Sequence, residues 1–288
     1  MADDPFSCFD DDSDSDNGVT AEIENVERDP TCGILAFHAG TEQALLNHVQ
    51  SRVSKSEANS VDASFILESV DEFCMQRHWM MHVGPEKTPI LSSFLKQMCD
   101  NKAKKEHITI VELGTYTGYS SIMISKVMRA IGVNFTIYTV EVVEGNVQVA
   151  QALVNLAGVQ DCVKILLLDP EKETLSAKLK AAMGDSAAID FLFIDHDKSL
   201  YLPDLKQIER AGYLKLGSYV AADNVIFAGI NDYREYIGNL VKNGIVKSRL
   251  EESWLEYCEP DFVSDNSKND LMKDGIGMST EYERKYIM

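Results

Sequence analysis

Residues 108–131, ITIVELGTYTGYSSIMISKVMRAI, decide the fold. Their first part, 108–113, is an apolar run rich in β-branched residues, which predicts a buried β-strand. Two glycines follow, Gly114 and Gly118, and residues 119–131 then repeat apolar side chains at the period of a helix. A strand that passes through a glycine turn into a helix is the repeating unit of a parallel α/β sheet.

The same alternation continues through the C-terminal part of the chain. Further strands are expected at 135–141, 163–168, 189–194 and 218–222, with two weaker strands near 247–256 and 276–286. Helices are expected at 146–157, 173–183, 202–211 and about 230–241, and the polar stretch 259–275 is expected to be a long loop. These segments predict an α/β, Rossmann-like, doubly wound sheet of seven mostly parallel strands with helices on both faces.

Three helical patterns precede the first strand, and no strand interrupts them. They are carried by Leu45, Val49 and Val53, by Ile66, Val70 and Phe73, and by Ile90, Phe94 and Met98. We therefore expect a single domain over 38–288, with N-terminal helices over 38–105 and an α/β core over 106–288.

The negative charge is concentrated at the N-terminus. The chain of 288 residues has a formal net charge of −19, and residues 1–30 hold eleven acidic residues and one basic residue, which leaves about −9 for the rest. This stretch has few aliphatic residues, so it buries too little apolar surface to offset the entropy of ordering. Residues 1–37 are therefore expected to be an acidic disordered tail that binds an unknown basic partner.

The composition disfavours several classes of protein. No run reaches the ~18 apolar residues of a membrane span, and the N-terminal residues lack the basic start and apolar stretch of a secretion signal. The six cysteines form no C-x-x-C pair, which argues against a disulfide framework or a structural zinc site. Clustered Lys and Arg are missing, which argues against nucleic acid. We expect a cytoplasmic monomer or weak dimer that acts on a small molecule.

Polar residues at the ends of the first two strands suggest a cofactor site. Glu112 and Gly114 end the first strand, and the spacing of Gly114 and Gly118 is G-x-x-x-G, which differs from the G-x-G-x-x-G of nicotinamide and flavin sites. Glu141 ends the second strand, where nucleotide-binding sheets place an acid that accepts the ribose hydroxyls. Together these features indicate an adenosine-bearing ligand. The alternatives are a glycine turn that only connects two elements and a solvated acid at a strand end.

Polar residues at the ends of the fourth and fifth strands suggest a metal site. Asp195 follows one strand, and Asp223 and Asn224 follow the other. Two carboxylates and an amide are hard oxygen ligands of the kind that Mg²⁺ prefers. Lys198 lies three residues after Asp195, and a nearby dication would disfavour its charged form and make it a proton acceptor. The alternatives are a surface aspartate, an asparagine that caps a helix and a solvated lysine.

Seven stretches resemble one known family in order and spacing. They are GTEQALLNHV (40–49), HWMMHVG (78–84), VELGTYTGYS (111–120), YTVEV (138–142), DHDKSLYLPD (195–204), ADNVI (222–226) and LEY (255–257). They resemble the catechol O-methyltransferases, which belong to the cation-dependent O-methyltransferases. The resemblance covers about residues 40–286. It implies a class I methyltransferase fold, S-adenosyl-L-methionine and Mg²⁺ as cofactors, and transfer of a methyl group to a hydroxyl of a catechol-like molecule.

The resemblance also implies roles for individual residues. The Mg²⁺ ligands would be Asp195, Asp223 and Asn224, with Lys198 as general base and Glu256 as acceptor of a hydrogen bond from the second catechol hydroxyl. The substrate site would be formed by Trp79, Met81, Lys198, Asn224 and Glu256. The cofactor site would be formed by Val83, Glu112, Gly114, Tyr116, Gly118, Ser120, Glu141, Asp195 and His196.

Three departures from the family's pattern bear on specificity. Asp197 stands where mammalian catechol O-methyltransferases have a tryptophan, and the resulting DHDK is closer to the DADK of relatives that methylate caffeoyl-type catechols. Ala228 replaces a proline at the substrate mouth, and LLLDPEKE (166–173) lacks the family's small adenine-contacting residues. The alternatives to a catechol O-methyltransferase are an enzyme for caffeoyl-type or other diphenols and a non-catalytic S-adenosylmethionine-binding interaction protein. A nicotinamide oxidoreductase is disfavoured by the glycine spacing.

Overall fold

The computed structural model describes residues 40–57, 60–101, 107–184, 187–226, 228–254, 256–257 and 273–280. Contacts divide the chain into two compact units, Met1–Ala44 and Leu45–Met288. In the first unit the described residues are 40–44, of which 41–44 are helical. The second unit carries the sheet. The tail predicted at 1–37, and the domain boundary predicted after it, lie outside the described residues and stay predictions.

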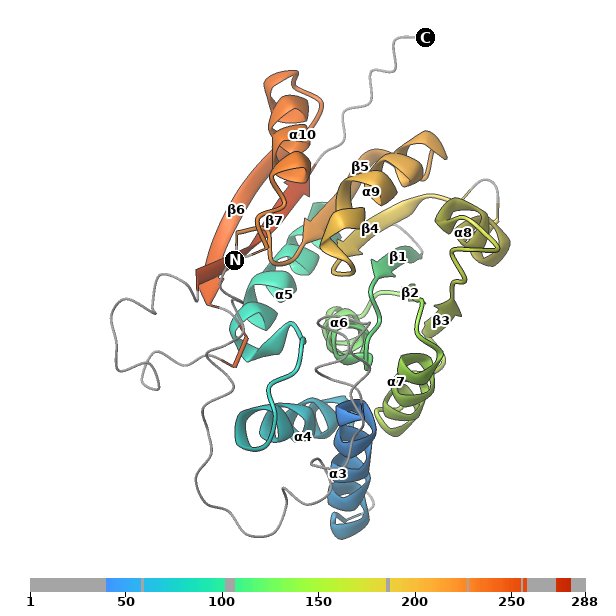
Figure 1. Cartoon of the computed structure of the whole chain (residues 1–288), viewed down its shortest axis with the longest axis vertical. Coiled ribbons are helices and arrows are strands. Elements are labelled where there is room, and N and C mark those ends of the chain that lie inside the picture. Colours follow the sequence, from blue (N-terminus) through green and yellow to red (C-terminus); the bar gives the residue numbers. More distant parts are fainter. Residues whose placement is uncertain are drawn as a thin grey trace, which may run out of the picture. The chain divides into compact units, whose positions relative to one another are not determined.

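The second unit contains one seven-stranded sheet (Figure 1). Its strands are β1 (Ile108–Leu113), β2 (Phe135–Glu141), β3 (Val163–Leu167), β4 (Ile189–Ile194), β5 (Leu214–Ala222), β6 (Lys247–Trp254) and β7 (Lys273–Thr280). The order is β3-β2-β1-β4-β5-β7-β6, and β7 runs antiparallel to both of its neighbours while the first five strands are parallel. The predicted seven-stranded, mostly parallel sheet is confirmed.

The predicted helices are also present. They are α3 (Thr41–Lys55), α4 (Ala63–Gln76), α5 (Gly84–Asn101), α6 (Tyr119–Ile131), α7 (Glu144–Leu156), α8 (Leu175–Met183), α9 (Tyr201–Arg210), α10 (Asn231–Lys242) and the 3₁₀ turn η2 (Lys198–Leu200). Residues that alternate along a strand face opposite sides of a sheet. Leu192 and Ile194 of β4 lie in one apolar cluster with Leu205 of α9, whereas Phe191 packs edge-on against Phe94 of α5. Helices therefore cover both faces.

Several strand boundaries differ from the prediction, and β3 ends at Leu167, one residue before the predicted 168. β5 starts at Leu214, before the predicted 218, because Leu214 pairs with Ile189 across an irregularity that contains the left-handed Gly217. β6 ends at Trp254, so Glu256 lies in the turn after the strand and not within it. β7 starts at Lys273 because pairing with β6 extends it into residues predicted as loop. The rest of that loop, and the strand residues predicted after 280, lie outside the described residues.

A polar cluster attaches α4 to the elements that carry the site. Asp71 of α4 accepts hydrogen bonds from the hydroxyls of Tyr119 (3.3 Å) and Tyr257 (2.9 Å). The ring of His82 stacks on Tyr119 with a centroid separation of 5.3 Å, and its Nε2 lies 2.7 Å from Oγ1 of Thr117. α4 is thereby joined to the glycine turn after β1 and to the turn after β6.

The Asp71 cluster predicts a specific pH dependence of stability. Burial raises the pKa of Asp71 to about 6, although the hydrogen bonds from Tyr257 and Tyr119 oppose this rise. The folded protein then binds the Asp71 proton more tightly than the unfolded chain, so this contribution to stability is lost as the pH rises towards and past 6. Relative to Asp71→Asn, the wild type is expected to lose about 1 kcal/mol between about pH 5 and 7.5. Chemical denaturation across this range measures the difference.

The matched control is Asp100→Asn, because Asp100 is an exposed carboxylate near the end of α5. This substitution should leave the difference from the wild type independent of pH. Parallel stability curves for the wild type and Asp71→Asn would contradict the assignment of a raised pKa to Asp71.

Candidate active site

The ends of parallel strands bring the predicted metal ligands together. In register, Leu113 of β1 pairs with Ile194 of β4, which pairs with Ala222 of β5. Asp195 and Asp223 are the next residues of β4 and β5, and the N–H of Asp223 donates to the carbonyl of Ile194 (3.0 Å). The two carboxylates therefore emerge from neighbouring strands at one edge of the sheet, as the sequence predicted.

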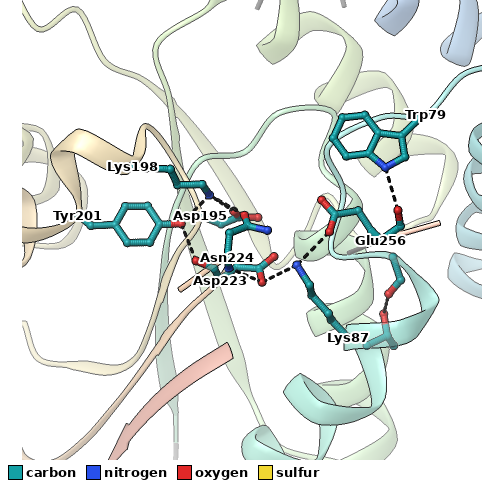
Figure 2. A network of polar contacts seen from close by, with 10 residues as sticks. Trp79, Lys87, Asp195, Lys198, Tyr201, Asp223, Asn224 and Glu256 are labelled. Carbon is teal, nitrogen blue, oxygen red and sulfur yellow. Dashed lines mark hydrogen bonds and ion pairs between the residues drawn. The ribbon is translucent and has the colours of Figure 1, made fainter. Parts of the chain in front are cut away.

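Lys198 binds to oxygens from three elements at this edge (Figure 2). Its Nζ lies 3.0 Å from Oδ1 of Asp195, 2.7 Å from Oδ1 of Asn224 and 2.7 Å from the hydroxyl of Tyr201. Tyr201, fully buried at the start of α9, also donates to the carbonyl of Asp223 (3.1 Å). Oxygens of Asp195 and Asn224 therefore converge on one cationic group.

Within the described residues no group of three or more His, Cys, Asp or Glu side chains is arranged to hold a metal ion. The predicted ligand set is not a group of that kind, because it consists of two carboxylates and one amide.

A second lysine lies on the other side of Asp223. Nζ of Lys87, from the start of α5, is 2.8 Å from Oδ1 of Asp223 and 2.9 Å from Oε2 of Glu256. All three side chains are at most 5% exposed. Burial raises the pKa of Glu256 and Lys87 opposes the rise; burial likewise raises the pKa of Asp195 and Lys198 opposes it.

Trp79 joins the predicted substrate residues to this network. Its indole N–H donates to the backbone carbonyl of Glu256 (2.8 Å), as Figure 2 shows. The side chain of Trp79 therefore lies beside Glu256, for which the family resemblance implies the role of hydrogen-bond acceptor for the substrate. Met81 is partly buried and Val83 is buried. Both lie in the segment between α4 and α5. The contacts predicted for them, of Met81 with the substrate and of Val83 with the cofactor, stay predictions.

The glycine turn after β1 packs against the end of β4. Gly114 has a φ of 96°, and a Cβ atom added there would lie 2.1 Å from the carbonyl oxygen of Asp195. Only glycine fits this approach, so Gly114 fixes the path of the backbone at Asp195 and His196. Gly118, with a φ of 88°, precedes α6 and allows this helix to start next to Ala150.

The carboxylate of Glu141 connects the two loops on the predicted cofactor side. It accepts hydrogen bonds from the N–H of Tyr116 (2.8 Å), in the glycine turn, and from the N–H groups of Val142 (2.8 Å) and Val143 (2.9 Å). A carboxylate has about four acceptor positions, so these bonds leave capacity for a ligand hydroxyl. This geometry is compatible with the predicted contact of Glu141 with ribose hydroxyls. Nothing in the sequence indicated that Glu141 also holds the backbone of two loops.

Glu112 is a fully buried acid at the end of β1. Its Oε2 accepts hydrogen bonds from the hydroxyls of Ser121 and Thr139, whereas its Oε1 is buried without a hydrogen-bond partner. Burial raises the pKa of Glu112, and the surrounding hydroxyls, including that of Ser120, oppose the rise. An unpaired buried acceptor requires an explanation, and a ligand that donates hydrogen bonds supplies one.

His196 and Asp197 hold the segment between β4 and α9. Nε2 of His196 lies 3.0 Å from Oδ2 of Asp204, and its ring stacks on Tyr201 with centroids 5.3 Å apart. Nδ1 of His196 is buried without a hydrogen-bond partner. Asp197 accepts hydrogen bonds from the N–H (2.8 Å) and hydroxyl (2.7 Å) of Ser199 and caps η2. Asp197 therefore has a local structural task, which the sequence did not reveal.

The backbone of the site is unusual at three positions. Among the described residues, Tyr116, Asn224 and Tyr257 are the non-glycine residues with positive φ, at 47°, 53° and 57°. Such conformations are uncommon outside glycine and tend to occur at functional sites. All three lie in turns that follow strands of the sheet, next to residues predicted to contact ligands.

Comparisons with known proteins agree with the family that the sequence resembles. The model of a family described as O-methyltransferase matches residues 57–237. Catechol O-methyltransferase B of Danio rerio is 33% identical over 215 residues, which cover 75% of this chain and 74% of the relative. Catechol O-methyltransferase of Bos taurus is 30% identical over 230 residues, which cover 78% and 75%.

A solved structure shares the fold. The O-methyltransferase from Bacillus cereus, in complex with SAH, superposes with a TM-score of 0.52 at 17% identity, over 81% of this chain and 96% of that one. The expected class I methyltransferase fold is thereby confirmed. The chain belongs to the O-methyltransferase family and, within it, is similar to the catechol O-methyltransferases.

Proposed function

We propose that this protein transfers a methyl group from S-adenosyl-L-methionine to one hydroxyl of a catechol-like small molecule, with Mg²⁺ as its metal cofactor. The observation that carries the proposal is the convergence of Asp195 and Asn224 on Lys198, at 3.0 and 2.7 Å, beside the pair of Asp223 and Glu256. Two lysines, the buried carboxylates of Asp223 and Glu256 and the partly buried carboxylate of Asp195 would provide oxygen ligands, a base and a hydrogen-bond acceptor in one place.

The residues present fit S-adenosylmethionine. Glu112 has a buried acceptor oxygen without a partner, which suits an ammonium donor such as the amino group of this cofactor. Glu141 keeps acceptor capacity for ribose hydroxyls after its three backbone hydrogen bonds. His196 has a buried ring nitrogen without a hydrogen-bond partner beside the glycine turn, which supports its predicted place in the cofactor site. These contacts would come from the ends of β1, β2 and β4.

The residues present also fit Mg²⁺. Asp195, Asp223 and Asn224 would hold it, and all three donors are hard oxygens, which Mg²⁺ prefers. When bound, the metal would supply positive charge that acidifies a hydroxyl and orients both oxygens of a diphenol. The carboxylates at this edge already attract two cationic side chains, which supports a site that favours positive charge.

In the proposed reaction Lys198 accepts the proton of the hydroxyl that is methylated. The hydroxyl oxygen forms a bond to the methyl carbon while the bond from carbon to sulfur breaks, and the proton goes to Nζ of Lys198. Glu256 accepts a hydrogen bond from the second hydroxyl and so orients the ring, and Trp79 forms one wall beside it. Positioning of this kind contributes a large part of the rate in transfer reactions.

We propose a diphenol as the substrate. The two alternatives, a caffeoyl-type substrate and a protein that binds S-adenosylmethionine without catalysis, are distinguished by the same tests. Asp197 caps η2 and Ala228 stands near Asn224, to whose carbonyl its N–H donates (3.1 Å). A small residue there leaves room at the mouth, which supports caffeoyl-type catechols as well as simple ones. A protein that binds S-adenosylmethionine without turnover is the remaining option.

We further propose a cytoplasmic location. None of the described helices is long and apolar enough to cross a membrane.

The first prediction concerns turnover. Purified protein with S-adenosylmethionine, Mg²⁺ and catechol should yield a monomethyl ether, detected by mass spectrometry, and EDTA should abolish the product because the ligand set is built for a divalent ion. Added Mg²⁺ should restore it. Absence of product across simple and caffeoyl-type diphenols, together with calorimetric binding of S-adenosylmethionine, would favour the non-catalytic option.

The second prediction concerns the base. Lys198→Met should lower kcat by about a hundredfold or more, because general-base catalysis contributes a factor of this order. The residual rate should rise with pH as hydroxide replaces the amine. Lys164→Met, at an exposed lysine of β3, is the control and should leave kcat unchanged. A Lys198→Met enzyme with normal kcat would exclude Lys198 as the base.

The third prediction concerns Glu141. Glu141→Gln keeps the shape of the side chain but removes its charge, so the hydrogen bonds to ribose and to the glycine turn weaken. The dissociation constant of S-adenosylmethionine, measured by calorimetry, should rise about tenfold. Glu144→Gln, at an exposed acid in the first turn of α7, should not change it. An unchanged constant for Glu141→Gln would remove Glu141 from the cofactor site.

A further inference from the structure

Lys87 is a fully buried cation that the proposed chemistry does not use. It lies in the first turn of α5, and its Nζ contacts a carboxylate at the end of β5 and another in the turn after β6. Asp223 is 2.8 Å away and Glu256 is 2.9 Å away. A buried lysine is costly unless paired, so these contacts fix the positions of all three side chains.

We propose that Lys87 is a positioning residue: it holds Glu256 at a fixed distance from Asp223 and thereby sets the preference for diphenols and for one of their two hydroxyls. The inference rests on the proposed function, in which Asp223 binds the metal and Glu256 receives the second hydroxyl. It adds the link between these two groups. Without Lys87, the carboxylate of Glu256, which receives the second hydroxyl, would move independently of Asp223, which binds the metal that orients the first.

The turn that carries Glu256 is held from three sides, and Lys87 is the contact that acts on the carboxylate. The carbonyl of Glu256 accepts the indole N–H of Trp79 (2.8 Å), and the next residue, Tyr257, donates its hydroxyl to Asp71 (2.9 Å). These two contacts fix the backbone and the neighbouring side chain. Figure 2 shows Lys87 between Asp223 and Glu256, with Trp79 on the far side of Glu256.

Acceptor capacity is compatible with this role. A carboxylate offers about four acceptor positions, so Glu256 can bind Lys87 through Oε2 and still accept a substrate hydroxyl. The pairing also keeps the direction of the carboxylate constant. A substrate with a single hydroxyl would lack the donor that Glu256 is positioned to receive, and a substrate with two adjacent hydroxyls would bind in one preferred orientation.

The first test does not depend on activity. The chain has two tryptophans, Trp79 and Trp254. A Trp254→Phe background leaves Trp79 as the only indole, and its hydrogen bond to Glu256 makes its fluorescence a report on this turn. Lys87→Met should shift the Trp79 emission and increase its quenching by acrylamide. Lys96→Met, at an exposed lysine of the same helix, is the matched control and should change neither.

The second test measures the reaction. With an asymmetrically substituted diphenol, Lys87→Met should lower kcat/KM by about ten- to hundredfold, as misplacement of a positioning group does, and move the ratio of the two monomethyl ethers towards one. KM for S-adenosylmethionine should stay unchanged. Glu256→Gln should shift the ratio in the same direction, and the double variant should lose no more than the larger single loss, because both changes break one link.

The outcomes separate the inference from the proposed function. If the wild type methylates no diphenol, the proposed function fails, while the fluorescence of Trp79 still tests the link. If Lys87→Met does not fold, as judged by circular dichroism, Glu256→Gln provides the fluorescence and product-ratio measurements. Trp79 emission and a product ratio equal to those of the wild type in the folded variants would overturn the inference. So would additive losses in the double variant, which would show that Lys87 does not act through Glu256.

Discussion

The site depends on the pairing of buried carboxylates with two lysines. Asp195, Asp223 and Glu256 follow β4, β5 and β6, and burial disfavours the charged forms of Asp195 and Glu256. Lys198 compensates Asp195 from one side, and Lys87 compensates Asp223 and Glu256 from the other. Removing one partner of a buried pair is more damaging than replacing the whole pair, so these five residues constrain one another.

The parallel part of the sheet was predictable because four of its five strands, β1 to β4, are mostly apolar runs of five to seven residues between helices of regular period. The proximity of Asp195 and Asp223 was predictable from the parallel topology, since each residue directly follows one of two neighbouring strands at the same edge of the sheet. Most of the predicted roles, however, came from the resemblance of seven stretches to one family. Residue-level reasoning alone left Lys198, Glu141 and the glycine turn with structural alternatives, and the structure assigns Glu141 and Gly114 structural contacts in addition to the proposed ones.

Other parts of the site gave no usable signal in the sequence. Lys87 stands in a segment of mixed polarity, where a lysine is usually solvated, and its burial depends on carboxylates from positions 223 and 256. Tyr201 and Asp71 resemble ordinary helix residues in the sequence, because contacts that give them their roles, with Asp223 and with Tyr257, join residues that are distant in sequence. β6 and β7 were placed with less accuracy because pairing, more than apolar periodicity, determines where antiparallel edge strands end.

The two lysines differ in exposure, and this difference fits different tasks. The side chain of Lys198 is 32% exposed, whereas that of Lys87 is fully buried. A general base must exchange its proton with the substrate and then with water, so a partly exposed amine at the end of a loop is suited to the role. A fully buried amine between two carboxylates is shielded from water in this structure, and its position is fixed by both partners. We therefore assign proton transfer to Lys198 and alignment to Lys87, although both are lysines within reach of the same strand ends.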